Sequence, residues 1–221
     1  MVVLATKCYV EGGARERALD SLRSLVENDL GDLDVESVVG VRDDEFVAVT
    51  VDGPDAVAAR NLLREEWGEI PSHFADGETY VGTLESWSDD GFVLDAGEEV
   101  LIPRSELGLD PGTPAQIRDR FGLVQHLPMK FVSGDPPRLA DEERDRLYEW
   151  TRGEGRVNVN SATRGEVRAT VNRAGHARDI VTVERLGLLE QSIVCKESTD
   201  PPGLLSSIGQ YLPAELKCVI P

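Results

Sequence analysis

A closely spaced series of short β-rich runs between Gly77 and Leu107 constrains the fold of this chain more than any other feature. Residues 80–84, 91–95 and 100–102 form the runs, and the turn-forming sequences SDDG and AGEE separate them. Short strands joined by tight turns pair as antiparallel hairpins. Strands of this kind typically build a small Greek-key barrel, which leaves few exposed sheet edges. We therefore expect a small β-barrel in the middle of the chain.

The segments on both sides of this region alternate between strands and helices. Before it, we expect strands at residues 2–10, 35–41 and 46–51 and helices at 14–30 and 55–67. After it, a short helical turn is expected at 117–121, a last barrel strand at 123–132 and a charged helix at 141–151. The C-terminal part predicts strands at 156–160, 179–185, 189–196 and 215–220, with helices at 164–174 and 202–212.

These element orders predict the fold class and the domain boundaries. The first part reads βαββα and the last part βαββαβ, which is the ferredoxin-like order. The sequence SGDPP at residues 133–137 is a clear linker signal. We therefore expect an α+β protein in which two ferredoxin-like α/β sandwiches flank a small barrel. The expected domains are residues 1–72, 73–135 and 136–221.

The acidic composition of the chain says more about the solvent in which the protein works than about its binding partner. Forty-one acidic residues face 23 basic ones, for a net charge of −18, and only four of the bases are lysines. Such a surface suits a salt-rich cytoplasm, where the Debye length of about 3 Å at 1 M salt keeps self-repulsion small. No apolar run is long enough to cross a bilayer, and the N-terminus does not resemble a signal peptide. We expect a cytoplasmic protein with no membrane partner.

The sequence contains none of the common motifs for metal, cofactor or catalytic sites. Its three cysteines (Cys8, Cys195 and Cys218) lie far apart in apolar runs, which predicts buried thiols and not a metal site. Nucleotide-binding glycine loops, H-E-x-x-H and G-x-S-x-G are all missing. We expect no cofactor and no enzymatic activity. An enzyme acting on nucleotides or RNA remains an alternative, and it would need a pocket with converging polar groups near His176 or Asp179.

The net charge changes sign between Arg156 and Lys196. This span holds seven basic and four acidic residues, a local charge of +3. Thr163 and Glu166 have the spacing of a helix capping box. Arginine groups on the solvent side of that helix suit phosphate oxygens, because the guanidinium presents paired donors in a fixed fork. The expected contacts are Arg156, Asn158, Asn160, Arg164, Arg168, Arg173, His176 and Arg178.

Alternative interpretations exist for these residues and for the barrel. Exposed arginines often pair with nearby acids, and a histidine such as His176 more often packs in a turn than acts in catalysis. In the barrel, base stacking is expected from Tyr80, Trp87 and Phe92, with Arg104 as the only base in the segment. Strand alternation leaves open whether Phe92 points outward or into the core. A barrel that docks onto another protein is therefore the alternative.

Two stretches resemble known families. In the barrel segment, G-x-x-x-x-W, D-G-F-V-L-D and L-I-P-R-S-E-L resemble an S1-like module of the OB fold. The C-terminal run that starts RVNVNSATRGEVRATVNRAGHARDIV resembles DUF2110, an archaeal family of unknown function, and the acid-rich, lysine-poor composition resembles its haloarchaeal members. The resemblance implies an archaeal cytoplasmic protein, and it transfers no activity and no catalytic residue.

These observations favour a non-enzymatic RNA-binding or ribonucleoprotein-associated protein of a high-salt cytoplasm. Phosphates would be contacted through the C-terminal arginines. The alternative is an interaction adaptor of the transcription or translation machinery that makes no direct contact with nucleic acid. The sequence leaves the oligomeric state open.

Overall fold

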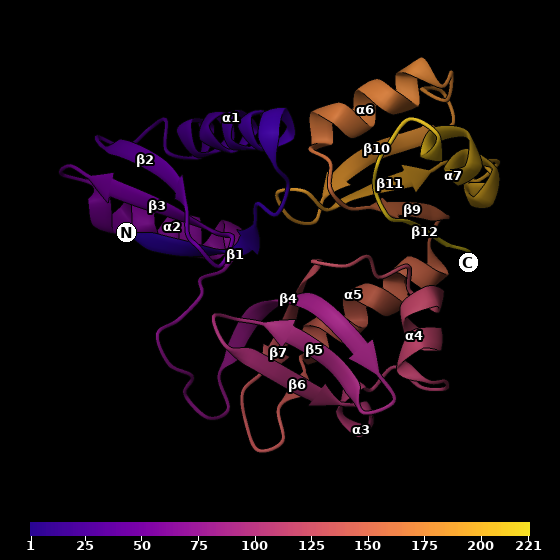
Figure 1. Cartoon of the computed structure of the whole chain (residues 1–221), viewed down its shortest axis with the longest axis horizontal. Helices are drawn as coiled ribbons and strands as arrows, with labels where there is room; N and C mark the ends of the chain where they lie inside the picture. Colours follow the sequence, from indigo (N-terminus) through magenta and orange to yellow (C-terminus); the bar gives the residue numbers. More distant parts are fainter.

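Three antiparallel sheets organise the computed structural model, which describes all 221 residues (Figure 1). The N-terminal sheet has the order β1-β3-β2, and its third strand lies between the other two. Both helices of this part pack their apolar sides into one core, which includes Leu22 of the first helix and Leu63 of the second. The elements are β1 (Val2–Lys7), α1 (Gly12–Asp29), β2 (Glu36–Val41), β3 (Phe46–Asp52) and α2 (Ala56–Trp67).

The central sheet is curled into a half-barrel with the order β6-β5-β4-β7-β8. The three expected strands of the Gly77–Leu107 segment are present as two successive hairpins. The elements are β4 (Thr79–Ser88), β5 (Gly91–Asp95), β6 (Glu99–Pro103), α3 (Arg104–Leu107), α4 (Pro114–Arg120), β7 (Pro128–Val132), β8 (Arg138–Leu139) and α5 (Asp141–Arg152). Leu147 and Trp150 of α5 belong to the core of this half-barrel, so the helix packs with the central sheet and not with the C-terminal one.

The C-terminal sheet has the order β10-β11-β9-β12, with every neighbouring pair antiparallel. Residues of α6 and α7, such as Val167 and Ile208, pack with Val157 and Ile193 of the sheet in one apolar core. The elements are β9 (Arg156–Val159), α6 (Arg164–Arg173), β10 (Ile180–Arg185), β11 (Gln191–Cys195), α7 (Pro201–Gly209) and β12 (Leu216–Val219).

Local sequence signals explain the start of α6. The Thr163 hydroxyl accepts a hydrogen bond from the Glu166 amide, and the Glu166 carboxylate accepts one from the Thr163 amide. This reciprocal arrangement is the capping box expected from the sequence. Val167 and Val171 then lie on the buried side of the helix, four residues apart, as the periodicity predicts.

One expected strand is wrong in its first half. Residues 123–127 form an irregular segment with a turn at Gln125 and His126, and β7 begins only at Pro128. Gly122 and His126 both have left-handed backbone angles (φ 61° and φ 66°), which interrupt an extended strand. Leu123 and Val124 are nevertheless fully buried. The two residues are apolar because they pack in the core of the half-barrel, and they do not belong to a strand.

The three parts of the chain contact one another closely. Leu188 and Leu189, at the tip of the β10–β11 hairpin, are buried in the apolar core of the N-terminal part. The Leu188 amide donates to the Thr6 hydroxyl of β1 at 2.9 Å. In Figure 1 the half-barrel lies beneath both the N-terminal and the C-terminal sheets. None of the helices combines the length and the apolar character that a bilayer crossing requires.

Candidate nucleic-acid interface

Four arginines on and directly after α6 carry charges that no carboxylate neutralises. Arg164, Arg168, Arg173 and Arg178 are all exposed, and none of them forms an ion pair. Elsewhere most basic side chains are paired: of the ten lysines and arginines in the whole chain without an ion pair, five lie between Arg164 and Lys196. The positive character of this region is therefore available at the surface.

The acidic residues of the same region are engaged with other groups. Glu166 caps α6 and pairs with Arg17 of α1 at 2.8 Å. Burial opposes ionisation of Glu166, but hydrogen bonds from Thr163 and Arg17 outweigh it and lower the pKa of this carboxyl. Glu184 pairs with Arg156, and Asp179 contacts His176. These carboxylates are thus not free to neutralise the α6 arginines.

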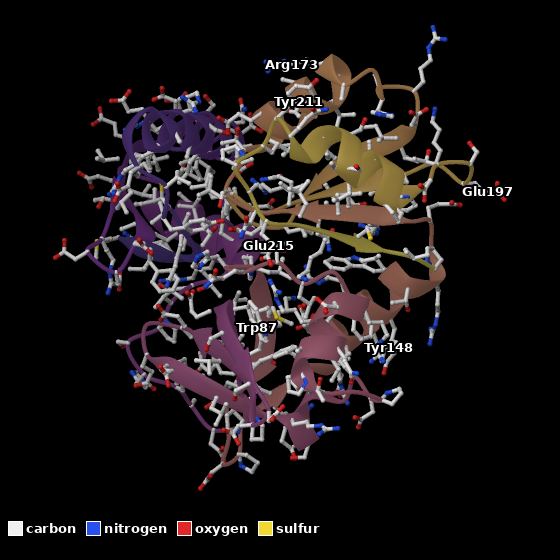
Figure 2. All side chains as sticks on the ribbon, turned by 45° about the vertical axis from the view of Figure 1, so that its right-hand side comes forward. Trp87, Tyr148, Arg173, Glu197, Tyr211 and Glu215 are labelled. Atoms are coloured by element: carbon white, nitrogen blue, oxygen red, sulfur yellow. The ribbon has the colours of Figure 1, made fainter.

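The helix geometry separates the three arginines that lie on α6. Arg164 and Arg168 are separated by four residues and lie on one side of α6, whereas Arg173 is turned away from Arg168 by about 140°. Arg168 and Ala177 line a shallow hollow of about 120 Å³ beside β10, and Arg178 follows Ala177 directly. Arg164, Arg168 and Arg178 are called the α6 patch below. Figure 2 shows Arg173 at the outer end of α6.

The expected contacts on strand β9 are not at the surface. Asn158 is fully buried and donates to the Gly122 carbonyl at 2.8 Å, and Asn160 donates to the Gln125 carbonyl at 3.2 Å. Both amides leave the same face of the strand, as alternation predicts, but that face is covered by the half-barrel. Arg156 pairs with Glu184. The sheet face of the C-terminal part is therefore closed to a nucleic acid.

The expected stacking residues of the half-barrel are also packed. Phe92 is fully buried in the core, which settles its orientation. Tyr80 packs against Phe74 with ring centroids 4.9 Å apart. The Arg118 guanidinium covers the Trp87 ring at 3.5 Å, and Figure 2 shows Trp87 between the half-barrel below and the C-terminal part above. Arg104 is the first residue of α3. It is exposed and makes no ion pair.

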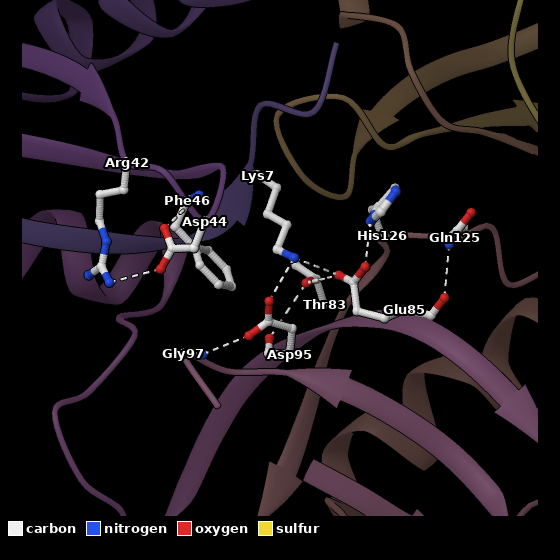
Figure 3. Close-up of polar contacts among 10 residues, drawn as sticks. All are labelled: Lys7, Arg42, Asp44, Phe46, Thr83, Glu85, Asp95, Gly97, Gln125 and His126. Carbon is white, nitrogen blue, oxygen red and sulfur yellow. Dashed lines mark hydrogen bonds and ion pairs between the residues drawn. The ribbon is translucent and has the colours of Figure 1, made fainter. Parts of the chain in front are cut away.

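A buried polar cluster at the junction of the three parts was not predicted from the sequence (Figure 3). Lys7 is only 6% exposed and binds Asp95 at 2.7 Å and Glu85 at 3.0 Å, so it ties β1 to the half-barrel. Burial lowers the pKa of Lys7, but these two carboxylates outweigh it and raise the pKa. Nδ1 of His126 lies 3.1 Å from Glu85. Burial opposes ionisation of Glu85, yet the bonds to His126 and Thr83 hold its pKa at about 2.

The most deeply buried acid of the chain belongs to the same junction. Glu190 has no exposed surface, and its Oε1 accepts a hydrogen bond from the Tyr9 hydroxyl at 2.6 Å. Its Oε2 has no partner. Burial raises the pKa of Glu190 to about 8, so the carboxyl is largely protonated at neutral pH. Burial also raises the pKa of Tyr9, which keeps its proton and accepts from the Ser161 amide at 2.9 Å.

A cleft of about 710 Å³ opens between α2, the half-barrel and α5. Its three basic residues already have carboxylate partners, because Arg64 binds Glu69, Lys130 binds Glu142 and Arg146 binds Glu143. An anionic ligand would have to displace these carboxylates. The cleft therefore has fewer free basic groups for phosphate binding than the α6 patch. No group of three or more His, Cys, Asp and Glu side chains in the protein is arranged to hold a metal ion.

Comparison with family models covers nearly the entire chain. The DUF2110 N-terminal domain matches residues 1–73, the DUF2110 central domain residues 74–151 and the DUF2110 C-terminal domain residues 154–220. These ranges agree with the three sheets described above, and the central range includes α5. No curated protein matches the sequence.

Proposed function

We propose that this chain, which belongs to the DUF2110 family over nearly its whole length, binds RNA or joins a ribonucleoprotein. The α6 patch would contact the phosphates. The observation that carries the proposal is the absence of any carboxylate partner for Arg164, Arg168 and Arg178 in a chain with 41 acidic residues. Arg164 already donates from Nε to the Val183 carbonyl at 2.6 Å, so its two terminal nitrogens and the guanidinium groups of Arg168 and Arg178 are the donors left for phosphate oxygens.

The surroundings of the α6 patch favour contacts to the backbone of the nucleic acid. The hollow beside it is lined by Ile180, Val181, Thr182 and Val183 of β10 and by Asn172, and it contains no aromatic ring on which a base could stack. Phosphate contacts position a nucleic acid without reading its sequence. We therefore expect binding with little preference for sequence and with strong dependence on salt.

The proposal includes two finer fold assignments, a ferredoxin-like C-terminal part and an S1-like central part. The order β10-β11-β9-β12 is consistent with a ferredoxin-like arrangement of the C-terminal part, and the curled central sheet with an S1-like module. We propose that both serve here as a scaffold that presents α6. The acidic, lysine-poor surface is consistent with a salt-rich archaeal cytoplasm.

The test is fluorescence anisotropy with a labelled single-stranded RNA of mixed sequence, titrated between about 0.5 M and about 3 M KCl. If three phosphates are contacted, the logarithm of the binding constant should fall with the logarithm of the salt concentration with a slope near −2. The variant Arg164→Glu/Arg168→Glu/Arg178→Glu should bind at least ~100-fold more weakly and lose most of that slope.

A matched variant controls for the change in net charge. Arg15, Arg60 and Arg152 also lack ion pairs but lie on α1, α2 and α5, and their substitution by glutamate changes the net charge equally. This control should bind RNA nearly as well as the parent. Equal affinities of the parent and the α6-patch variant would refute the proposal. Capture of partner proteins that survive nuclease treatment and depend on the α6 patch would favour the adaptor function instead.

A further inference from the structure

Three side chains near the end of α6 form a hydrogen-bonded chain of serine, histidine and aspartate. Nδ1 of His176 lies 2.7 Å from Oδ2 of Asp179, and Nε2 of His176 lies 2.9 Å from Oγ of Ser207 on α7. An ionised carboxylate only accepts hydrogen bonds, so Nδ1 must carry the proton that it shares with Asp179. In the neutral ring Nε2 is then the acceptor, and the Ser207 hydroxyl donates to it.

The orientation of Ser207 differs from that of an ordinary serine within a helix. Such serines commonly donate to the carbonyl four residues earlier, whereas the only hydrogen-bond partner of the Ser207 hydroxyl is His176. The hydroxyl is partly exposed, and so are the His176 ring (28%) and the Asp179 carboxylate (45%). All three groups can therefore be reached from solvent.

A hollow of about 350 Å³ adjoins this chain of residues. Its lining consists of His176, Asp179, Ser198, Thr199, Asp200, Gly203 and Leu204, so the hollow reaches the imidazole and the carboxylate but not Ser207 itself. The backbone amides of Ala177 and Arg178, which directly follow His176, make no hydrogen bond within the protein. Backbone amides are common donors to a developing oxyanion, and these two are the unpaired amides that follow His176 directly in the chain.

We propose that Ser207, His176 and Asp179 form a nucleophile, general base and orienting acid that hydrolyse small polar carboxylic esters. This inference goes beyond RNA binding and does not depend on it, because the reaction uses no side chain of the α6 patch; Arg178 adjoins the site only through its backbone amide. The geometry is that of serine hydrolases, which recurs on unrelated folds and in any chain order.

The reaction needs only the ester and water. Ser207 Oγ attacks the carbonyl carbon while its proton passes to Nε2 of His176, and the Asp179 carboxylate stabilises the imidazolium through Nδ1–H. The C–O bond of the ester breaks, and the leaving alkoxide takes the proton from Nε2. A water molecule then gives a proton to His176 and attacks the acyl group on Ser207. The bond between Ser207 Oγ and the acyl carbon then breaks, and Oγ takes the proton from Nε2 of His176. The carboxylic acid leaves and the serine hydroxyl is restored.

A purely structural role makes a different prediction. As a hydrogen-bonded link between the end of α6 and α7, the same three residues would affect stability and leave Ser207 no more reactive than any other exposed serine. Ser206, the preceding residue of α7, is exposed and is the natural comparison. Reactivity that is specific to Ser207 thus separates the two roles.

The experiment treats the full-length protein in KCl buffer with a fluorophosphonate probe and identifies the modified peptide by mass spectrometry. Hydrolysis of p-nitrophenyl acetate is measured in parallel. We expect a phosphonyl adduct on Ser207 and not on Ser206. The Ser207→Ala and His176→Gln variants should lower the protein-dependent hydrolysis at least ~100-fold, and Asp179→Asn at least ~10-fold.

Two controls decide between loss of folding and loss of chemistry. The Ser206→Ala variant should react like the parent, and circular dichroism should show that Ser207→Ala remains folded. The proposal would be overturned if the folded parent carried no adduct on Ser207. It would also be overturned if His176→Gln were labelled on Ser207 as strongly as the parent. Ester hydrolysis that is equal in the parent and Ser207→Ala would do the same.

Discussion

Replacing Glu190 by glutamine should remove a large part of the pH dependence of stability. In the native protein, burial raises the pKa of this carboxyl from 4.5 to about 8. Between these values the unfolded chain has released the Glu190 proton and the native state still holds it. The unfolded state is therefore favoured increasingly as pH rises, by about 1.4 kcal/mol per pH unit. The stability associated with the protonated carboxyl is complete below pH 4.5 and is lost as the pH rises through about 8.

The structure sets the size of the effect and its surroundings. The rise of the Glu190 pKa from 4.5 to about 8 corresponds to ~5 kcal/mol over the whole window. The charged or titratable groups around Glu190 are the Tyr9 hydroxyl, which donates to it, and more remotely Glu85, whose negative charge adds to the rise of the pKa. Glutamine is neutral at every pH and its carbonyl oxygen can accept the Tyr9 hydrogen bond, so Glu190→Gln should show no such loss.

The assay is urea-induced unfolding of the parent and Glu190→Gln at constant KCl between pH 5 and 8. The difference in unfolding free energy between the two proteins should change by ~1.4 kcal/mol per pH unit, in favour of the variant as pH rises. Because the slope is tested, a constant cost of the amide group does not affect the result. The Glu98→Gln variant, at an exposed turn residue, controls for removal of a carboxylate. A difference in unfolding free energy that stays constant between pH 5 and 8 would refute the conclusion that Glu190 is buried and protonated.

Three further substitutions test the fold and its junction by denaturant unfolding. Phe92→Ala should cost about 3–5 kcal/mol, because Phe92 fills the core of the half-barrel; a cost below about 1 kcal/mol would mean that the ring is exposed, as in a stacking surface. Gly91→Ala should cost at least ~2 kcal/mol, since Gly91 has φ 151° and an added Cβ would collide with the backbone of Ile102. Lys7→Met should cost ~3 kcal/mol by leaving Asp95 and Glu85 without their shared partner, and a neutral effect would place this ion pair at the surface.

Much of the local structure followed from the sequence because its causes are local. The capping box at Thr163 started α6 where it was expected, and the SDDG turn placed the hairpin of β4 and β5. The failure at residues 123–127 has an equally local cause, since the left-handed conformation of His126 has no reliable signature in a histidine. Apolar composition alone could not distinguish a strand from a buried turn.

The candidate sites show the opposite balance. The charge reversal, the helix that carries Arg164 and Arg168, and the alternation that points Asn158 and Asn160 to one side could all be predicted from the residues. Coverage of that side, and the other partners of the region's acids, became known only from the folded chain. Folding also brought Ser207 to His176 and enclosed Glu190. Exposure and ion pairing depend on which surfaces meet, and the contacts between the parts join residues up to 182 positions apart, beyond the reach of any local pattern.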